Sequence, residues 1–555
     1  MRPYRIASSL VLLALAGCVS GSPGPAAPTD ADAPHHFDGT GPHRRTITTG
    51  SKDAQAWFDQ GLVFAYSFNH DEAVRSFTAA AEADPRAPMA WWGIALAHGP
   101  HINNPVVPPA REQAACDAVK QALALKAGAS QVEAALIDAL AKRYVSPPTP
   151  DRAARDAAYA DAMRAVWKAY PKDADVGALC AEALMDLHPW DLWKHDGTAQ
   201  PWTGEILGVL EAVQKLEPDH PGALHFYIHA VEAGPDPRRA LAAANRLRVL
   251  VPASGHMLHM PSHIDVLLGQ WQEAIDSNER AIESDLAYRK VRPHQDFHHV
   301  YMAHNNQMLA FAGMMDGRSQ LAIESAREVA PGVPDDYARS QTATIEPYFA
   351  ILYDALVRFG KWDEILAEPA PPDYLHVTNA FWRFARGAAF AAKGQVKEAE
   401  AEAGKLREIA AKIPPDRMLA INPAKNVLAI AGHVLDGEIA YRKGEVDKAV
   451  GQLKQAIALE DELVYMEPPE WPLPVRHTLG AILLDAGKIP EAEAAYREDL
   501  EQWPGNGWSL YGLAECAKRK GAAGDEAAKA AKAFNDAWAD ADVKITASCA
   551  CITKK

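Results

Sequence analysis

Two consecutive 34-residue segments of this 555-residue chain carry the same histidine pattern. His225 and His229 lie 34 positions before His259 and His263. Self-similarity at a period of about 20 to 50 residues indicates a solenoid, in which each repeat is one supersecondary unit stabilised by its neighbours. At this period the unit is a pair of helices. The feature therefore predicts an all-α chain built from helical hairpins.

The first clear repeat spans residues 54–87 and shows how such a hairpin is built. Its key positions are Trp57, Gly61, Phe64, Ala73, Phe77, Ala80 and Pro85. Small residues fit where the two helices cross, aromatic residues fill the gaps, and proline ends the second helix. This spacing resembles the consensus of the tetratricopeptide repeat family. The resemblance implies a right-handed solenoid in which the first helix of each hairpin lines a concave groove.

We expect the chain to divide into five parts. They are a lipoprotein signal peptide over residues 1–17, a flexible tether over 18–50, an N-terminal repeat array over 51–345, a C-terminal repeat array over 346–545, and a tail over 546–555 that contains Cys549 and Cys551. The tether is predicted from a composition rich in Pro, Gly, Ala and Asp. In the tail, a short-range disulfide, a soft-metal clip and an idle segment all remain open.

The first residues resemble a secretory signal peptide. Arg2 and Arg5 precede an apolar stretch that is too short to span a bilayer. It ends in Leu15-Ala16-Gly17-Cys18, which resembles the lipobox of bacterial lipoproteins. The resemblance implies cleavage before Cys18 and acylation of its thiol, with palmitate among the attached chains. Val19 follows in place of an inner-membrane retention signal, so we expect an outer-membrane anchor facing the periplasm. An ordinary cleaved signal is the alternative.

The charge balance restricts the partners. The formal net charge is −16 at neutral pH. Nucleic acid binding needs a basic surface that displaces counterions, so we expect no nucleic acid partner. An acidic chain also gains little at anionic headgroups, which leaves the lipid anchor as the only expected membrane contact.

The histidines are concentrated in one region. Nine of the 21 lie within the 80 residues from His225 to His304. Pairs spaced i, i+4 share one helix face. The family resemblance places six of them on groove-facing positions of three consecutive repeats: His225, His229, His256, His259, His263 and His304.

This constellation predicts a transition-metal site. Our main hypothesis uses His229, His259 and His263, with either His225 or His304 as a fourth ligand. Imidazoles from packed helices can share one ion at about 2.0–2.1 Å each. Copper, iron, zinc and nickel all accept such ligands.

Two further features bear on the chemistry of this site. Glu232 lies one turn beyond His229 and is the candidate carboxylate ligand or general base, in a metal-dependent oxidoreductase or hydrolase. Four nearby methionines would favour copper if they were ligands and are otherwise apolar core: Met257, Met260, Met302 and Met308.

Two insertions break the period beside these histidines, over residues 187–205 and 282–303. Insertions in solenoids form loops, often on a binding face. Trp190 and Trp193 in the first insertion either cap a pocket or anchor the loop. The insertions indicate a local functional site within an otherwise ordinary repeat array.

An alternative function remains open. By resemblance to the family, the groove is where a protein or peptide partner would dock, and the histidines would then hydrogen-bond that partner. The sequence has no phosphate-binding glycine loop, dinucleotide fingerprint, His-Glu-x-x-His motif or nucleophile elbow. Sequence alone thus predicts the fold and a site, and leaves metal binding and partner docking as the two candidate functions.

Overall fold

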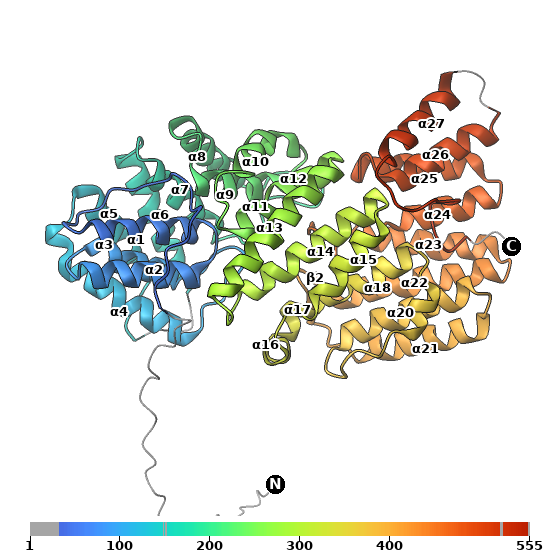
Figure 1. The fold of residues 1–555 in the computed structure, drawn as a ribbon, viewed down its shortest axis with the longest axis horizontal. Helices are drawn as coiled ribbons and strands as arrows, with labels where there is room; N and C mark the ends of the chain where they lie inside the picture. The colour runs from blue at the N-terminus through green and yellow to red at the C-terminus, as the bar shows by residue number, and fades with distance from the viewer. Residues whose placement is uncertain (1–32, 148, 150–151, 522–524, 553–555) are drawn as a thin grey trace, which may run out of the picture.

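The computed structural model describes residues 33–147, 149, 152–521 and 525–552. The predicted signal peptide over 1–17 and the predicted lipidation site Cys18 lie outside these residues. Figure 1 shows the described chain as an elongated array of helices that runs from the N-terminal helices at one end to the C-terminal helices at the other.

The N-terminal half consists of thirteen α-helices among the described residues. They are α1 (Lys52–Tyr66), α2 (His70–Ala83), α3 (Pro88–Ala97), α4 (Pro109–Leu125), α5 (Gln131–Leu140), α6 (Ala153–Ala169), α7 (Ala174–Met185), α8 (Thr203–Leu216), α9 (Pro221–Glu232), α10 (Leu241–Leu247), α11 (Gly255–His259), α12 (Pro261–Leu268) and α13 (Trp271–Val291). Two short 3-10 turns, η2 (Lys126–Gly128) and η3 (Pro237–Ala240), precede α5 and α10.

The second half continues the array. Its elements are α14 (His298–Asp316), α15 (Ser319–Val329), α16 (Asp335–Ser340), α17 (Thr342–Phe349), α18 (Ile351–Arg358), α19 (Trp362–Ala367), α20 (His376–Ala392), α21 (Val396–Lys412), β1 (Met418–Leu419), β2 (Asn422–Pro423), α22 (Ala424–Arg442), α23 (Val446–Glu460), α24 (Val475–Asp485), α25 (Ile489–Gln502), α26 (Gly507–Arg519) and α27 (Asp525–Ala537). The two strands pair antiparallel. No described helix is both long enough and apolar enough to cross a membrane.

Successive helices pack as hairpins along most of the chain, for example α1 with α2, α20 with α21 and α22 with α23. The crossing of the first hairpin uses the residues that the sequence singled out. A Cβ atom added at Gly61 would lie 2.7 Å from the ring of Phe77, which is itself fully buried. Glycine therefore lets α1 approach the aromatic side chain of α2 closely. The all-α fold of helical hairpins is confirmed.

The segment before α1 differs from the prediction. Residues 33–50 were expected to belong to a flexible tether, but they lie against the array, and His43, Arg45 and Ile47 are buried. His43 contacts Asp175 and Glu217, each at 3.0 Å, and Nη1 of Arg45 donates to Asp173 and Asp175. These polar partners come from later helices, so the composition of the segment gave no sign of them.

Loops from both halves converge near the middle of the array. Residues 186–202 join α7 to α8 through an irregular loop, in which Trp193 pairs with Ala199. In the second half, the β1–β2 turn and residues 461–474, between α23 and α24, are the corresponding irregular connections. Side chains of all three connections line one cavity beside the histidines. The solenoid thus provides the helices, and its irregular connections enclose the site.

Candidate metal centre

Four helices carry the six predicted histidines to one place. His225 and His229 come from α9, His256 and His259 from α11, and His263 from α12. His304 comes from α14, and all six side chains are buried. The structure brings the six side chains close together, inside the protein and not on an open groove wall.

A break in the helix separates α11, which carries His259, from α12, which carries His263. Pro261 lacks an N–H and begins α12, so the backbone pattern changes there. The hydroxyl of Ser262 donates to the carbonyl oxygen of His259 at 2.7 Å, which satisfies this acceptor at the break. His259 and His263 consequently face each other, with Nε2 to Nε2 at 2.7 Å.

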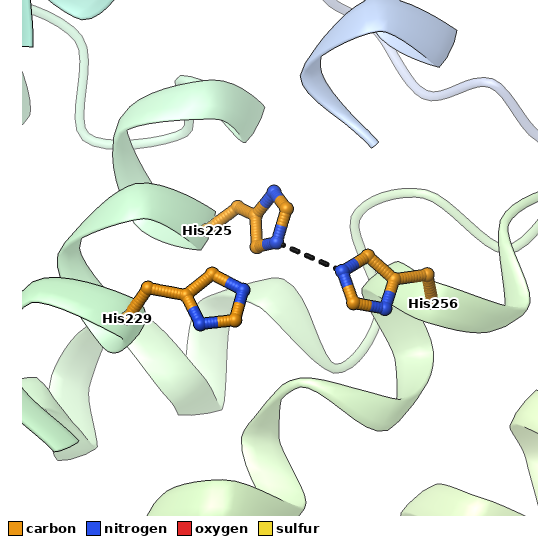
Figure 2. A group of neighbouring side chains, drawn as sticks. All are labelled: His225, His229 and His256. Atoms are coloured by element: carbon orange, nitrogen blue, oxygen red, sulfur yellow. Dashed lines mark hydrogen bonds between the residues drawn. The ribbon is translucent and has the colours of Figure 1, made fainter. Parts of the chain in front are cut away.

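The first group of three consists of His225, His229 and His256, shown in Figure 2. One ring nitrogen of each lies within 4.8 Å of those of the other two. Nε2 of His225 is 3.1 Å from Nε2 of His256, and Nδ1 of His225 is 2.7 Å from the carbonyl oxygen of Tyr66. Nε2 of His229 is buried and has no hydrogen-bond partner among the described residues.

The second group consists of His259, His263 and His304, again with ring nitrogens within 4.8 Å of one another. Nδ1 of His259 is 2.7 Å from Oδ1 of Asn278. The amide nitrogen of Asn278 donates to the carbonyl of Ala274, so Oδ1 is the atom that faces the imidazole. Asn278 is a positioning residue that the sequence analysis missed.

Two glutamates contact the Nδ1 atoms of His229 and His263, on the side of each ring opposite Nε2. Glu232 accepts from Nδ1 of His229 at 2.8 Å through one oxygen and from Nδ1 of His263 at 2.6 Å through the other. Glu467 lies 3.0 Å from the same Nδ1 of His263. Both carboxylates are buried. Glu232 therefore bridges the two groups, since each of its oxygens accepts a hydrogen bond from one of them. Its role as a general base stays a prediction.

The pKa shifts reflect this burial and pairing. Burial would raise the pKa of Glu232, but the nearby His229 and His263 outweigh it and lower the pKa to about 2. Burial lowers the pKa of His263, yet Glu467 and Glu232 together raise it to about 10. Burial and neighbouring imidazoles lower the pKa values of His225, His256 and His259 well below their usual range. Burial and His263 also lower the pKa of His304, to about 3. Most of the cluster is therefore uncharged at neutral pH.

The hydrogen bonds assign the tautomers. A ring nitrogen that faces an oxygen acceptor must carry the hydrogen, and in a neutral imidazole the other nitrogen then bears a lone pair. His229, His259 and His263 all have Nδ1 against such an oxygen. Their Nε2 atoms are thus the ones that face the cluster, and the raised pKa of His263 places a proton between its Nε2 and the Nε2 lone pair of His259, where a metal ion would take its place.

A cavity of about 450 Å³ lies beside the two groups. Four of the histidines line it: His229, His256, His263 and His304. Its other walls are largely apolar or aromatic, from Trp190 in the α7–α8 loop to Tyr301 and Tyr348, with Met418 and Met466 from the second half of the array. The cluster is therefore reachable by a small ligand.

Several other predicted residues fall outside this site. Met257, Met260, Met302 and Met308 are buried core residues, and none of them lines the cavity. His298 and His299 are buried on α14 but belong to neither group, while His294 is exposed. Of the two tryptophans, Trp190 lines the cavity. Trp193 instead anchors its loop, because its indole N–H donates to the carbonyl of Ala230 at 2.9 Å.

Another buried group, His43, Asp175 and His220, is also close enough to bind an ion. Its carboxylate is already engaged, since Asp175 accepts from Tyr66 at 2.7 Å and from Arg45 at 3.0 Å. We interpret this group as the fastening of residues 33–50 to the array.

No family model matches the sequence, and no curated protein matches it. Among solved structures, the APC/C hetero-tetramer Cut9-Hcn1 aligns with 89% of this chain and 78% of its own at 12% identity, with a TM-score of 0.31. The human IFIT1 dimer with m7Gppp-AAAA aligns with 90% of this chain and 92% of its own at 12% identity, also with a TM-score of 0.31.

At this level of similarity neither match carries an argument about this chain. The chain is an all-α helical-repeat protein by its own architecture, and its distinguishing feature is the buried histidine cluster.

Proposed function

We propose that this helical-repeat protein binds a transition-metal ion through its buried histidine cluster. One observation carries the proposal. The hydrogen bonds of Nδ1 on His229, His259 and His263 to oxygen acceptors leave the Nε2 atoms of these buried rings as ligand positions, and those of His259 and His263 lie 2.7 Å apart. A proton held between His259 and His263, or a metal ion in its place, satisfies both nitrogens, and a metal ion would also give a partner to the buried Nε2 of His229, which has none among the described residues.

The distances fit such an ion with small adjustments. Imidazole nitrogens at about 2.0–2.1 Å from a tetrahedral ion lie roughly 3.4 Å from one another. Nε2 of His225 and His256 are 3.1 Å apart, and Nε2 of His259 and His263 are 2.7 Å apart. The second pair would separate by less than about 1 Å on binding.

The surrounding residues supply what a bound metal needs. Ligating imidazoles usually donate their other N–H to a carboxylate, amide or backbone carbonyl, which fixes the ring and raises its basicity. Glu232, Asn278 and the carbonyl of Tyr66 provide these acceptors here. The two buried carboxylates, Glu232 and Glu467, also offset the charge of a divalent ion. The donor set suits copper, iron or zinc.

The cavity beside the cluster supports a further step in the same proposal. A ligand set with an open position permits chemistry, whereas a closed one stores or carries the metal. The 450 Å³ cavity reaches His229, His256, His263 and His304. We therefore propose a metal-dependent oxidoreductase or hydrolase as the enzymatic form of this function.

A second candidate function is partner docking, and the helical-repeat fold favours it. Helical-repeat proteins present extended surfaces that recognise other chains. Val106, which is 73% exposed, lies at the edge of the cavity together with the exposed Met418. A partner segment with an apolar side chain would cover both residues. The burial of the histidines argues against their direct use in that contact.

The envelope anchor belongs to the same proposal. The lipobox-like Leu15-Ala16-Gly17-Cys18 supports lipidation at Cys18 and a location on the periplasmic face of the outer membrane. Mass spectrometry of the protein from its membrane fraction tests it. The mature chain should begin with an acylated Cys18, and an unmodified chain beginning elsewhere would overturn the anchor.

Metal analysis tests the main function. The untagged protein, as purified and after reconstitution with copper, iron or zinc, should retain at least one ion per chain through gel filtration. His259→Ala with His263→Ala should lower retention by at least about tenfold while helicity is kept. His433→Ala is the matched control, because this half-buried histidine of α22 hydrogen-bonds Gln452 and lies in none of the histidine groups of the described chain.

Two results decide between the candidates. Absence of any retained ion after reconstitution would overturn the metal proposal. Co-purification of a partner that is lost on Val106→Asp and insensitive to chelators would instead support docking.

A further inference from the structure

Residues 542–552 lie against the C-terminal half of the array. Hydrogen bonds hold this segment at Asp542 and at Ser548. Asp542 accepts from the backbone N–H groups of Ser319 and Gln320 at 2.7 and 2.9 Å. The hydroxyl of Ser548 donates to the carbonyl of His477 at 2.8 Å and lies 2.7 Å from the hydroxyl of Tyr496. The two cysteines that follow are therefore held at a defined place.

These cysteines form a disulfide between Cys549 and Cys551, which are separated by one residue. Cys551 is buried, at 3% exposure, whereas Cys549 is half-buried. Cys549 lines a cavity of about 700 Å³ whose walls include Trp362 and Trp508. One sulfur of the pair is thus accessible to a ligand in this cavity, and the other is enclosed.

A buried carboxyl group lies near both sulfurs. Glu438 projects from the middle of α22, is 5% exposed, and has a carboxylate oxygen within 4.8 Å of both sulfur atoms. No hydrogen bond or ion pair links its carboxyl to another residue in the described part of the chain. Burial raises its pKa to about 7, so it exchanges a proton near neutral pH. The charge of Arg442, four residues further along α22, lowers the pKa of this carboxyl and partly offsets the effect of burial.

The accessible sulfur has hydrogen-bond donors. The backbone N–H of Cys551 donates to Sγ of Cys549 at 3.1 Å, and the hydroxyl of Thr478 donates to the same atom at 3.5 Å. Donors to sulfur favour its thiolate form, which is the reactive nucleophile and the better leaving group. The two sulfurs are therefore chemically distinct, because the hydrogen bonds favour a thiolate at the accessible Cys549, while Cys551 is enclosed with Glu438 within reach.

We propose that Cys549 and Cys551 form a thiol–disulfide exchange centre, in which Cys549 reacts with a cysteine of a second protein and Glu438 carries the proton for Cys551. In the oxidising direction, a partner thiolate attacks Sγ of Cys549. The bond between the two cysteines breaks, a mixed disulfide forms, and the Cys551 sulfur leaves and takes the proton of Glu438.

The exchange is completed by a second thiolate of the same partner. It attacks the partner's own sulfur in the mixed disulfide and releases Cys549 as a thiolate. The partner dithiol is oxidised to a disulfide, and the Cys549–Cys551 disulfide is reduced to a dithiol. Exchange in reverse with another protein disulfide restores the starting state, so electrons and protons balance without a further reagent.

The cavity indicates the form of the partner. Its walls combine Trp362, Trp508 and Phe359 with the cationic Arg358 and Lys544. This surface suits an extended peptide segment with apolar side chains near its cysteine and an acidic residue close by. The thiol–disulfide exchange centre shares no residue with the histidine cluster, so its test is independent of metal binding.

Reduced glutathione serves as the probe for the test. The folded full chain is incubated with glutathione between pH 6 and 8, quenched with an alkylating reagent, and its cysteine-containing peptide is weighed. In a separate incubation with oxidised glutathione, the Cys549 thiolate of Cys551→Ser should attack the glutathione disulfide, form a mixed disulfide and release one reduced glutathione. Glu438→Gln should slow opening of the disulfide by at least about tenfold. Glu460→Gln is the matched control, since Glu460 is a carboxyl of α23 whose pKa burial also raises, to about 8, away from the sulfurs.

A measurement on the unmodified chain covers the case in which Glu438→Gln fails to fold. The opening rate, divided by the glutathione thiolate concentration, should be high below pH 7 and fall as pH rises through about 7, because only the acid form of Glu438 protonates Cys551. A flat normalised profile, equal rates in Glu438→Gln and Glu460→Gln, or opening only in denaturant would each overturn the proposal.

Discussion

Nε2 of His259 lies 2.7 Å from Nε2 of His263, and in each ring the opposite nitrogen faces an oxygen acceptor. Two lone pairs at that distance repel each other. Either a proton or a metal ion must therefore occupy the space between them. The raised pKa of His263, about 10, shows that the carboxylates Glu232 and Glu467 stabilise a positive charge at this point. The same field favours a metal cation.

Glu232→Gln should weaken metal binding by about 10- to 100-fold, which is the usual effect of removing a hydrogen-bond acceptor of ligating histidines. A glutamine side chain offers one oxygen, so it cannot accept from both His229 and His263. Competition with a chromophoric chelator measures the affinity. Glu211→Gln is the control because this carboxylate bonds Tyr227 and Arg239 near the surface. Equal affinities in the two variants would contradict the positioning role of Glu232.

Metal removal should lower the thermal stability of the wild-type chain. A ligand that binds only the folded state at about 1,000 times its Kd stabilises it by about 4 kcal/mol. Scanning calorimetry with and without a chelator measures the shift in Tm. The double variant of His259 and His263 to alanine should show no chelator effect. A chelator effect of the same size in that variant would place the metal elsewhere.

The fastening of residues 33–50 should weaken at alkaline pH. Burial lowers the pKa of His43, but hydrogen bonds with Asp175 and Glu217 raise it to about 9. Because the folded pKa exceeds the unfolded value of about 6.5, this stabilisation is complete below pH 6.5 and is lost as pH rises through 9.

The difference in Tm between wild type and His43→Gln should therefore be largest near pH 6 and smallest above pH 9. His35→Gln, on the same segment but exposed, is the control. A Tm difference that stays constant across this range would show that His43 acts only through packing.

The hairpin fold was predictable because it follows from local patterns. The 34-residue period and the small-residue positions such as Gly61 depend on neighbours in sequence, and the structure reproduces them. The convergence of His225, His229, His259 and His263 was predictable for the same reason, since equivalent positions of adjacent repeats lie side by side.

The enclosure of the site was not predictable from the same patterns. Glu467 reaches His263 from about 200 residues further along the chain, in an irregular loop with no repeat pattern. Asn278 is one polar residue on the outer helix of a hairpin and carries no signal in the sequence. The packing of residues 33–50 depends on single ion pairs, such as that of Arg45 with Asp175, which composition does not reveal.

Gly61→Ala should destabilise the first hairpin by about 1–3 kcal/mol, the usual cost of overpacking a core. The added methyl group would lie 2.7 Å from the ring of the fully buried Phe77. Gly208→Ala on α8 is the matched control, because nothing lies within 4 Å of a Cβ atom there. That change should stabilise the helix by about 0.5–1 kcal/mol. Chemical denaturation measures both, and changes of the same sign would contradict the helix crossing described here.

Glu467→Gln should weaken metal binding less than Glu232→Gln does, because Glu232 still accepts from Nδ1 of His263 when Glu467 is neutral. The two carboxylates share one imidazole, so the double variant should lose more affinity than the sum of the single changes in free energy. Glu470→Gln is the control, since this neighbouring carboxyl is also buried but bonds Asn422 instead of a histidine. Additive losses, measured by the same chelator competition, would show that Glu467 closes the cavity without acting on the metal.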